Sequence, residues 1–338
     1  MAEEHFVVIG NGPCGHEAAI TLRERAPLAR ITIIGKENEP SYQPHLLPGY
    51  LAGTLTEDAL YISSYEYYKK NEIKFRCGQE VVYLDPNERC VILDHKERVP
   101  FTGAVIAVGG APQIPETLWS VRESLQTLKT LEDAKRWIRL LPTVESILIV
   151  GGDLTSFGFT RALLQLGKRV HFILNERSFW PLRCNEMIYA DVKEKLLEMG
   201  VDVVSSQHIQ GITQIPKNRY SVHVEGKELI VEMIGAFFGL IPDVGFLQRS
   251  GLTLDRGILV DEYLNTGHEA IYAAGDCAQI YHPAIRDYWV SIGHENAKAL
   301  GRIAAINLVG GRVRAEVARE SIYEVEGIRV NTSWWMDF

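Results

Sequence analysis

The stretch Phe6-Val7-Val8-Ile9-Gly10-Asn11-Gly12-Pro13-Cys14-Gly15 decides the fold of this chain. An apolar run leads directly into the motif G-x-G-x-x-G, and the sequence that follows has a helical pattern. In such a turn Gly10 permits the tight bend, Gly12 lets the backbone approach a pyrophosphate, and Gly15 lets the helix pack close to the strand. The helix N-terminus offers N–H groups and a positive dipole end to phosphate. The motif predicts a dinucleotide site formed by Gly10, Asn11, Gly12, Pro13, Cys14 and Gly15.

A second strand and an acidic residue follow where a βαβ unit requires them. Residues 31–34, Ile-Thr-Ile-Ile, form the expected strand, and Glu37 comes shortly after it. A carboxylate at this place can bind the ribose hydroxyls of a dinucleotide. The position of the glycine motif between strand and helix, with this acid behind it, favours a dinucleotide site over a glycine-rich loop without a ligand.

Length and composition narrow the class of protein. The chain has 338 residues, enough for two domains or for one large domain with an insertion. The net charge of −8 and the lack of a basic run argue against nucleic acid as a partner. We expect no transmembrane segment, because no apolar run is long enough, and no signal peptide, because the N-terminus is acidic. The five cysteines are widely spaced, which predicts no metal site and a reduced, cytoplasmic location.

A second strand and glycine turn begin in the middle of the chain. Residues 147–153, Ile-Leu-Ile-Val-Gly-Gly-Asp, read as a buried strand that runs into a turn. A helix is expected at 155–166 and another strand at 169–174. The chain therefore repeats the βαβ unit at the level of fold. From about residue 240 the pattern returns to short strands, and the strand at 271–274 ends at Gly275-Asp276.

Together these pieces resemble the pyridine nucleotide–disulfide oxidoreductase superfamily, flavoproteins with two dinucleotide-binding domains. Four motifs carry the resemblance in the family's order. They are the turn at 10–15, residues 105–112 in place of a strand ending A-T-G-x-x-P, the turn at Gly151, and Tyr-Ala-Ala-Gly-Asp at 272–276. The resemblance covers the chain to about residue 310. It points to the branches with rubredoxin reductases, nitrite reductase flavin domains and type II NADH dehydrogenases.

The resemblance implies an α/β fold with two Rossmann-like dinucleotide-binding domains, the second inserted in the first. The FAD-binding domain would comprise residues 1–112 plus 240–311, the NAD(H)-binding-like domain residues 113–239, and a short C-terminal tail residues 312–338. In the family the aspartate of the last motif contacts the ribityl chain of FAD. The further FAD-binding residues implied here are Glu37, Val81, Ala107, Val108, Gly109, Gly275 and Asp276.

The second glycine turn departs from the family pattern. An aspartate replaces the glycine that would let phosphate approach the backbone, and a carboxylate beside a pyrophosphate is repulsive. The usual acid after the next strand is replaced by Leu174. Asn175 and Glu176 are nearby as substitutes, and Arg177 is the lone candidate partner for a 2′-phosphate. We expect weakened NAD(H) binding, with NADH preferred over NADPH; the alternative is a domain that has lost its nucleotide. The candidate residues are Gly151, Gly152, Asp153, Leu154, Thr155 and Ser156.

The loop after the second strand carries His45 where thiol-using relatives carry a cysteine. Disulfide exchange at this loop is therefore disfavoured. The ordinary pKa of histidine suits proton transfer near neutral pH, so His45 is the candidate catalytic residue. A loop histidine that only packs is the alternative. Cys14 is expected to be a small buried residue rather than a nucleophile.

The resemblance implies an FAD-dependent NAD(P)H oxidoreductase. Such an enzyme exchanges a hydride with NAD(H) and electrons with an external redox partner of the Fe–S protein, rubredoxin or ferredoxin type. The alternatives are a flavoprotein relay or scaffold subunit of a larger redox complex, and a quinone or oxygen reductase. The last residues include Trp334, Trp335 and Phe338, and we expect these aromatic side chains to pack on the chain itself or on a partner.

Overall fold

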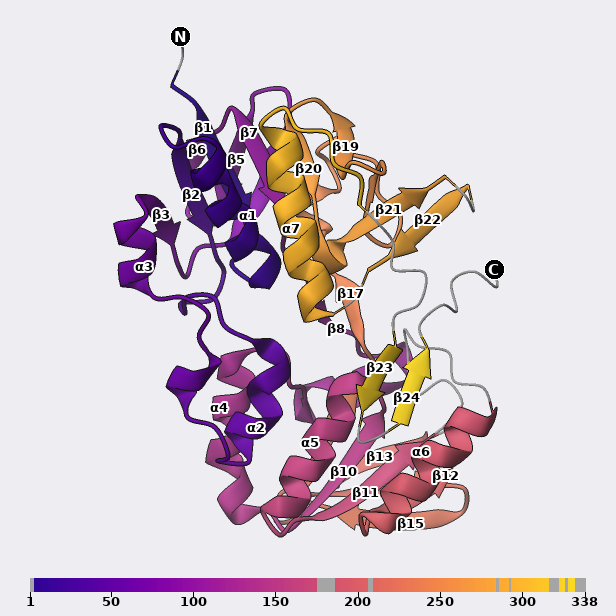
Figure 1. Cartoon of the computed structure of the whole chain (residues 1–338). Coiled ribbons are helices and arrows are strands. Elements are labelled where there is room, and N and C mark those ends of the chain that lie inside the picture. The colour runs from indigo at the N-terminus through magenta and orange to yellow at the C-terminus, as the bar shows by residue number, and fades with distance from the viewer. Residues whose placement is uncertain are drawn as a thin grey trace. The chain divides into compact units, whose positions relative to one another are not determined.

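The computed structural model describes residues 3–174, 186–205, 209–283, 286–291, 293–315, 322–325 and 328–331 (Figure 1). Backbone contacts divide the chain into two units. The first comprises Met1–Gln43, Tyr61–Ala111 and Ile241–Val317, and the second comprises Pro44–Leu60, Pro112–Leu240 and Ala318–Phe338. Within the described ranges, no helix has the length and apolar composition that a membrane crossing requires.

The first unit is built on a six-stranded sheet with the order β19-β20-β7-β1-β2-β3. Strand β1 (His5–Ile9) pairs in parallel with β2 (Arg30–Ile34) and with β7 (Gly103–Ile106). The sheet continues in parallel to β3 (Ile73–Arg76) and β20 (Ile271–Ala273), and β19 (Asn265–His268) closes it antiparallel. Every residue of β1 is buried, as expected for a parallel strand covered on both faces.

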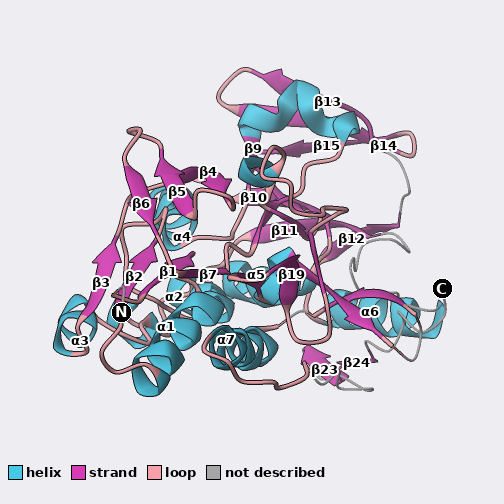
Figure 2. Cartoon of the chain, turned by 90° about the horizontal axis from the view of Figure 1, so that it is seen from above, coloured by secondary structure: helices cyan, strands magenta, loops and turns pink. Residues whose placement is uncertain are grey.

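Two helices cover one face of this sheet and an antiparallel meander covers the other (Figure 2). The helices are α1 (Pro13–Arg25) and α7 (His294–Leu308). A Cβ atom on Gly301 of α7 would lie 2.1 Å from the Cys14 carbonyl oxygen, so a glycine lets the two helix backbones touch. The meander consists of β4 (Val81–Asp85), β5 (Cys90–Leu93) and β6 (Arg98–Pro100).

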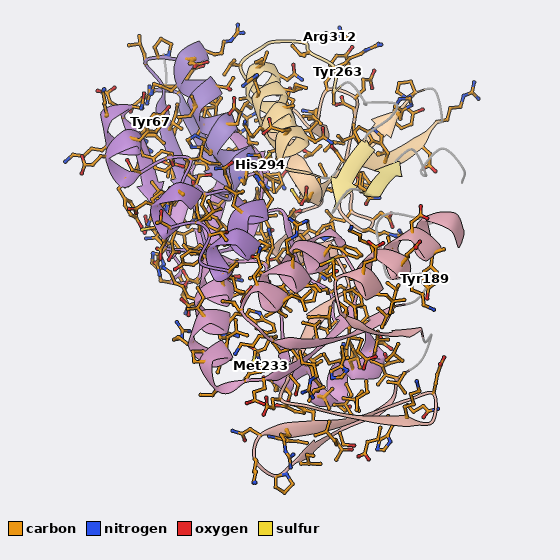
Figure 3. The ribbon with its side chains drawn as sticks, turned by 60° about the horizontal axis from the view of Figure 1, so that its bottom comes forward. Tyr67, Tyr189, Met233, Tyr263, His294 and Arg312 are labelled. Carbon is orange, nitrogen blue, oxygen red and sulfur yellow. The ribbon has the colours of Figure 1, made fainter. Side chains whose placement is uncertain are left out.

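The chain after α7 is fastened to the first unit by polar and aromatic contacts. Asn307 donates from Nδ2 to the carbonyl oxygens of Tyr263 and Val313, both over 2.8 Å. The Arg312 guanidinium lies 5.0 Å from the centre of the Tyr263 ring (Figure 3). A cation over an aromatic face is attractive, so Tyr263 anchors the segment that follows the helix.

The second unit contains a five-stranded parallel sheet with the order β12-β11-β10-β16-β9. Helices α5 (Leu154–Gln165) and α6 (Glu186–Glu198) lie on one face, and the antiparallel strands β13, β14 and β15 lie on the other (Figure 2). Trp137, in α4 (Leu131–Leu140), is fully buried, with its ring centre 4.6 Å from that of Phe159. The remaining strands are β9 (Leu125–Gln126), β10 (Ser146–Gly151), β11 (Arg169–Leu174), β12 (Asp202–Ser205), β13 (Ile209–Ile215), β14 (Arg219–Val224), β15 (Lys227–Val231) and β16 (Met233–Phe237).

Residues 44–60 leave the first unit and belong by their contacts to the second. They form η1 (Pro44–Leu46), α2 (Leu47–Leu51) and η2 (Glu57–Leu60). The Glu57 carboxylate accepts hydrogen bonds from Lys135 Nζ over 2.9 Å and from the Tyr50 hydroxyl over 3.0 Å. The sequence had placed this segment with the rest of residues 1–112. The α/β class with two Rossmann-like sheets is confirmed, while the assignment of a cofactor to each domain stays a prediction.

Candidate nucleotide-binding turns

The first glycine turn joins β1 to α1 at the carboxyl end of a central strand. Gly10 has a φ of 105°, and a Cβ atom there would lie 2.2 Å from the Ala107 carbonyl oxygen. A Cβ atom on Gly15 would lie 2.0 Å from the Gly10 carbonyl oxygen. Any side chain at these two positions would collide with backbone. Packing alone therefore requires glycine at positions 10 and 15.

Gly12 differs from both, because packing does not require a glycine there. It is the N-cap of α1, with φ −70° and ψ −176°, and a Cβ atom there would have no neighbour within 4 Å. No side chain caps this helix N-terminus. Open space in front of uncapped N–H groups is what a phosphate needs. The turn fits the pyrophosphate of a dinucleotide.

A chain of hydrogen bonds through the buried side chains of Tyr68 and His16 holds Asn11 in this turn. The hydroxyl of Tyr68, in α3 (Tyr65–Lys70), donates to Asn11 Oδ1, and His16 Nδ1 lies 3.0 Å from the same hydroxyl oxygen. Because the phenol gives its only proton to Asn11, His16 must donate through Nδ1. Burial lowers the pKa of His16, which keeps the imidazole neutral. Sequence reasoning missed Tyr68 and His16, since no motif marks them.

The other residues predicted for the first site follow neighbouring strands. Glu37 comes after β2, residues 107–109 after β7, and Gly275 and Asp276 after β20. With β1 these strands are consecutive in the sheet and parallel, so their carboxyl ends share one edge, where ligands bind in such folds. A Cβ atom on Gly275 would lie 3.2 Å from Cys14 Sγ, which places the two turns against each other.

Glu37 and Val81 lie on the side of the first unit formed by β2, β3 and the meander. The Tyr42 hydroxyl donates to Glu37 Oε2 over 2.7 Å, and the Gly78 N–H donates to the Glu37 carbonyl oxygen over 3.0 Å. Val81 is buried at the start of β4. The two hydrogen bonds hold Glu37 in place just after β2, and the roles of Glu37 and Val81 in binding FAD stay predictions.

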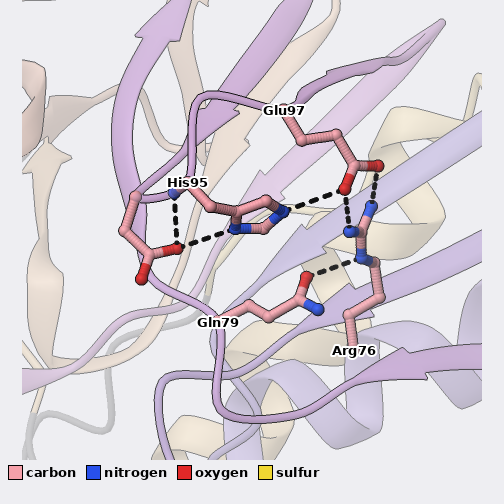
Figure 4. A network of polar contacts seen from close by, with 5 residues as sticks. Arg76, Gln79, His95 and Glu97 are labelled. Atoms are coloured by element: carbon pink, nitrogen blue, oxygen red, sulfur yellow. Dashed lines mark hydrogen bonds and ion pairs between the residues drawn. The ribbon is translucent and has the colours of Figure 1, made fainter.

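A surface network braces the loop between β3 and β4 (Figure 4). Arg76 donates from Nη1 to Glu97 Oε1 and from Nε to Gln79 Oε1, both over 2.7 Å. His95 Nε2 lies 3.0 Å from Glu97 Oε2 and its Nδ1 lies 3.0 Å from Asp94 Oδ1. Hydrogen bonds to Glu97 and Asp94 raise the pKa of His95. The network ties β3 to the turn between β5 and β6.

The buried thiols of the first unit are poor nucleophiles. Burial raises the pKa of Cys14 well above its usual value and raises the pKa of Cys277 to about 11. Both groups are therefore thiols rather than thiolates at neutral pH. This agrees with Cys14 as a small buried residue of the turn.

The second glycine turn is similar to the first at Gly151 but differs at its middle residue and at the N-terminus of the helix that follows. Gly151 has a φ of 100°, and a Cβ atom there would lie 2.0 Å from the Phe237 carbonyl oxygen. Asp153 is the N-cap of α5, and its Oδ1 accepts the Ser156 N–H over 3.0 Å. Burial raises the pKa of Asp153 to about 6. A carboxylate of the chain itself caps this helix, so the turn fits a pyrophosphate less well than the turn at Gly12.

The other residues of the second turn lie directly before and after the capping residue Asp153. Gly152, with a φ of 136°, precedes Asp153, and Leu154 and Thr155 open the helix. Ser156 takes the place of a third glycine, and its Oγ donates to the Asp153 carbonyl oxygen over 2.6 Å. The second turn therefore accommodates a side chain at this position. In the first turn, a side chain at position 15 would collide with the Gly10 carbonyl oxygen.

His45 lies in η1, at the start of the segment that belongs to the second unit, and its side chain is exposed. Its catalytic role stays a prediction. The residues expected to choose between NADH and NADPH, Glu176 and Arg177, lie outside the described residues. The aromatic residues Trp334, Trp335 and Phe338 do so as well.

Residues 4–294 match the family model described as pyridine nucleotide-disulphide oxidoreductase. The chain belongs to this family, which confirms the resemblance seen in the sequence. It is an FAD-dependent oxidoreductase that uses a nicotinamide nucleotide.

Several reductases share most of their length with this chain. It is 28% identical over 327 residues to putidaredoxin reductase CamA of Pseudomonas putida, covering 94% of this chain and 77% of that protein. It is 29% identical over 312 residues to the ferredoxin–NAD(+) reductase component of the 3-phenylpropionate/cinnamic acid dioxygenase of Photorhabdus laumondii, covering 92% and 79%. A NAD-dependent persulfide reductase from A. fulgidus is similar in structure, with TM-score 0.86, 25% identity and coverage of 95% and 62%.

Proposed function

We propose that the first unit holds FAD and exchanges a hydride, through it, with NADH bound by the second unit. The observation that carries this proposal is the open, uncapped turn at Gly12, at the sheet edge that also carries Glu37, Gly109 and Asp276. Bound FAD supplies hydride acceptance and one-electron transfer. The chain's own residues supply the uncapped N–H groups for its pyrophosphate and the carboxylates for its hydroxyl groups.

We propose a small redox protein of the Fe–S, rubredoxin or ferredoxin type as the external partner, and a cytoplasmic location. Relatives are named as reductases of such proteins, among them putidaredoxin reductase and a ferredoxin–NAD(+) reductase component. The raised pKa values of Cys14 and Cys277 disfavour a thiol step at these two residues. Free cysteines, Cys14, Cys77, Cys90 and Cys277 among them, suit a reducing compartment.

Anaerobic mixing of the purified holoprotein with NADH tests the proposal. We expect rapid bleaching of the flavin, slower bleaching with NADPH, and faster reoxidation by a rubredoxin or a [2Fe–2S] ferredoxin than by a quinone or oxygen. A flavin that NADH leaves oxidised would instead favour a relay or scaffold subunit. The side-chain cap at Asp153 is the observation that favours this second function.

Two side chains have proposed roles that single substitutions separate. Asp276, in η6 (Gly275–Cys277), is proposed to bind the ribityl chain of FAD, so Asp276→Ala should purify without yellow colour. His45 is proposed to deliver a proton, so His45→Gln should slow turnover with FAD content unchanged. An Asp276→Ala protein that holds FAD as tightly as the parent, or a fully active His45→Gln protein, would remove the respective role.

A further inference from the structure

The two glycine turns match in backbone conformation at their first and third residues but differ at the second, where Gly152 has a φ of 136° and Asn11 has no positive φ. Gly12 has φ −70° and ψ −176°, and Asp153 has φ −75° and ψ 175°. Two residues before each of them lies a glycine with φ near 100°, Gly10 in the first turn and Gly151 in the second. Both of those glycines lie against a carbonyl oxygen of the neighbouring strand end. The second turn thus shares these two features with the first, while its Gly152 and Asp153 N–H groups both donate to the Phe237 carbonyl oxygen.

The two turns differ in what lies at the helix N-terminus. At α1 no side chain caps the helix, and a Cβ atom on Gly12 would have no neighbour within 4 Å. At α5 the Asp153 carboxylate accepts the Ser156 N–H, in the place where the first turn leaves an anion site open. A helix N-terminus favours one negative charge, and here the chain itself supplies it.

We propose that Asp153 is a built-in competitor of the nicotinamide nucleotide: its carboxylate occupies the pyrophosphate position at α5 and sets a low affinity for NAD(H). The nucleotide binds fully only when this side chain gives up its cap. The inference rests on the proposed function, in which NADH is the hydride donor. It names Asp153 as the residue that limits binding of this nucleotide.

The surroundings of Asp153 are consistent with a side chain that can be displaced. The groups that stabilise its charge are backbone N–H groups, of Ser156 and Thr155 on α5 and of Gly239 beyond β16. Burial outweighs them and disfavours the charged form. A helix cap of this kind is also a modest contribution to stability, and glycine at an N-cap costs only a few tenths of a kcal/mol relative to aspartate. Removing the carboxylate should leave the fold intact.

Calorimetric titration of the oxidised holoprotein with NAD+ and with ADP-ribose tests the proposal without any turnover. We expect Asp153→Gly to bind both ligands at least tenfold more tightly than the parent. Asp153→Asn keeps a capping side chain without the charge, so a gain there as well assigns the competition to charge, and a gain only in the glycine variant assigns it to space. Glu198→Gln, at the exposed end of α6, is the matched control for net charge and should change neither affinity.

Unchanged or weaker binding in both Asp153 variants, with FAD content and melting temperature retained, would overturn the proposal. Should Asp153→Gly not fold, Asp153→Asn alone decides: tighter binding supports competition by charge and unchanged binding rejects it. The outcome is separate from that of the proposed function. If Asp153→Gly binds NAD+ tightly but NADH does not reduce its flavin, the proposal that Asp153 competes with the nucleotide stands. The proposal that NADH donates a hydride to the flavin is then rejected.

Discussion

Tyr68 and Asn11, which are 57 positions apart in the sequence, are joined by a hydrogen bond of 2.8 Å from the phenol to the amide oxygen. Asn11 lies inside the first glycine turn, and its Nδ2 donates to the Glu39 carbonyl oxygen over 3.1 Å. Both ends of the amide are therefore fixed. The conformation of the turn depends on a helix that no nucleotide motif includes.

Replacing Tyr68 by phenylalanine should loosen this turn. The change leaves Asn11 Oδ1 and His16 Nδ1 without their shared partner in a buried place, which costs about 1–3 kcal/mol. We expect a lower urea midpoint for the apoprotein and weaker FAD binding, measured by flavin fluorescence. Tyr67→Phe is the control, because Tyr67 is 40% exposed. Equal behaviour of the two variants would show that the hydrogen bond does not position the turn.

Gly10 and Gly12 should respond in opposite ways to substitution. Gly12→Asp gives α1 the capping residue that α5 has, so the apoprotein should fold with unchanged or slightly higher stability and bind no FAD. Gly10→Ala places a methyl group 2.2 Å from a carbonyl oxygen at positive φ, so the apoprotein itself should lose more than about 1 kcal/mol. Thermal unfolding of both apoproteins and their flavin content check this. Retention of FAD by Gly12→Asp would mean that the pyrophosphate lies elsewhere.

The protonation of Asp153 should couple pH to both stability and binding. Its pKa in the fold, about 6, lies above the ordinary value, so the fold favours the neutral carboxyl. The contribution of this group to stability therefore grows as pH falls through 6 towards 4 and is lost as pH rises, with a size of about 1–3 kcal/mol. The groups that face the carboxyl are the N–H groups of Ser156, Thr155 and Gly239.

Calorimetry in buffers of different ionisation enthalpy measures the linked proton. Binding of NAD+ should be tighter at pH 5.5 than at pH 7.5, with net proton uptake near pH 6.5, and Asp153→Asn should abolish both effects. Proton uptake that persists in Asp153→Asn would assign the coupling to another group.

The cysteines should differ in their reaction with iodoacetamide. Cys14, Cys90 and Cys277 are buried, and burial raises the pKa of Cys14 and of Cys277. Cys77 is partly exposed, so the native protein should be modified there before these three. Mass spectrometry of the modified peptides gives the order. Early modification of Cys14 would reveal a reactive thiol in the turn.

The sequence was most informative where the backbone itself needs a particular residue. Gly10, Gly15 and Gly151 are required by collisions with carbonyl oxygens, so their spacing was enough to predict both turns. Asp153 was visible as a departure, but its bond to Ser156 depends on helix geometry. The bond between Tyr68 and Asn11 could not be predicted, because tertiary packing brings the two together.

The attachment of residues 44–60 was likewise invisible in the sequence, since Glu57 and Lys135 carry no pattern that links them. A segment was therefore predicted in the first domain that belongs by its contacts to the second. Local periodicity locates a helix but does not say which sheet the helix will join.

That attachment limits how far this protein can be treated as modular. A gene fragment encoding only residues 112–240 would leave Lys135 without Glu57 and expose the surface on which Leu47 and Leu51 are buried. Recombination that exchanged the inserted domain at its two apparent borders would break the same contacts. An exchange of residues 112–240 between relatives must therefore include residues 44–60 from the same parent. The segment that has to be exchanged as one piece is discontinuous in the sequence.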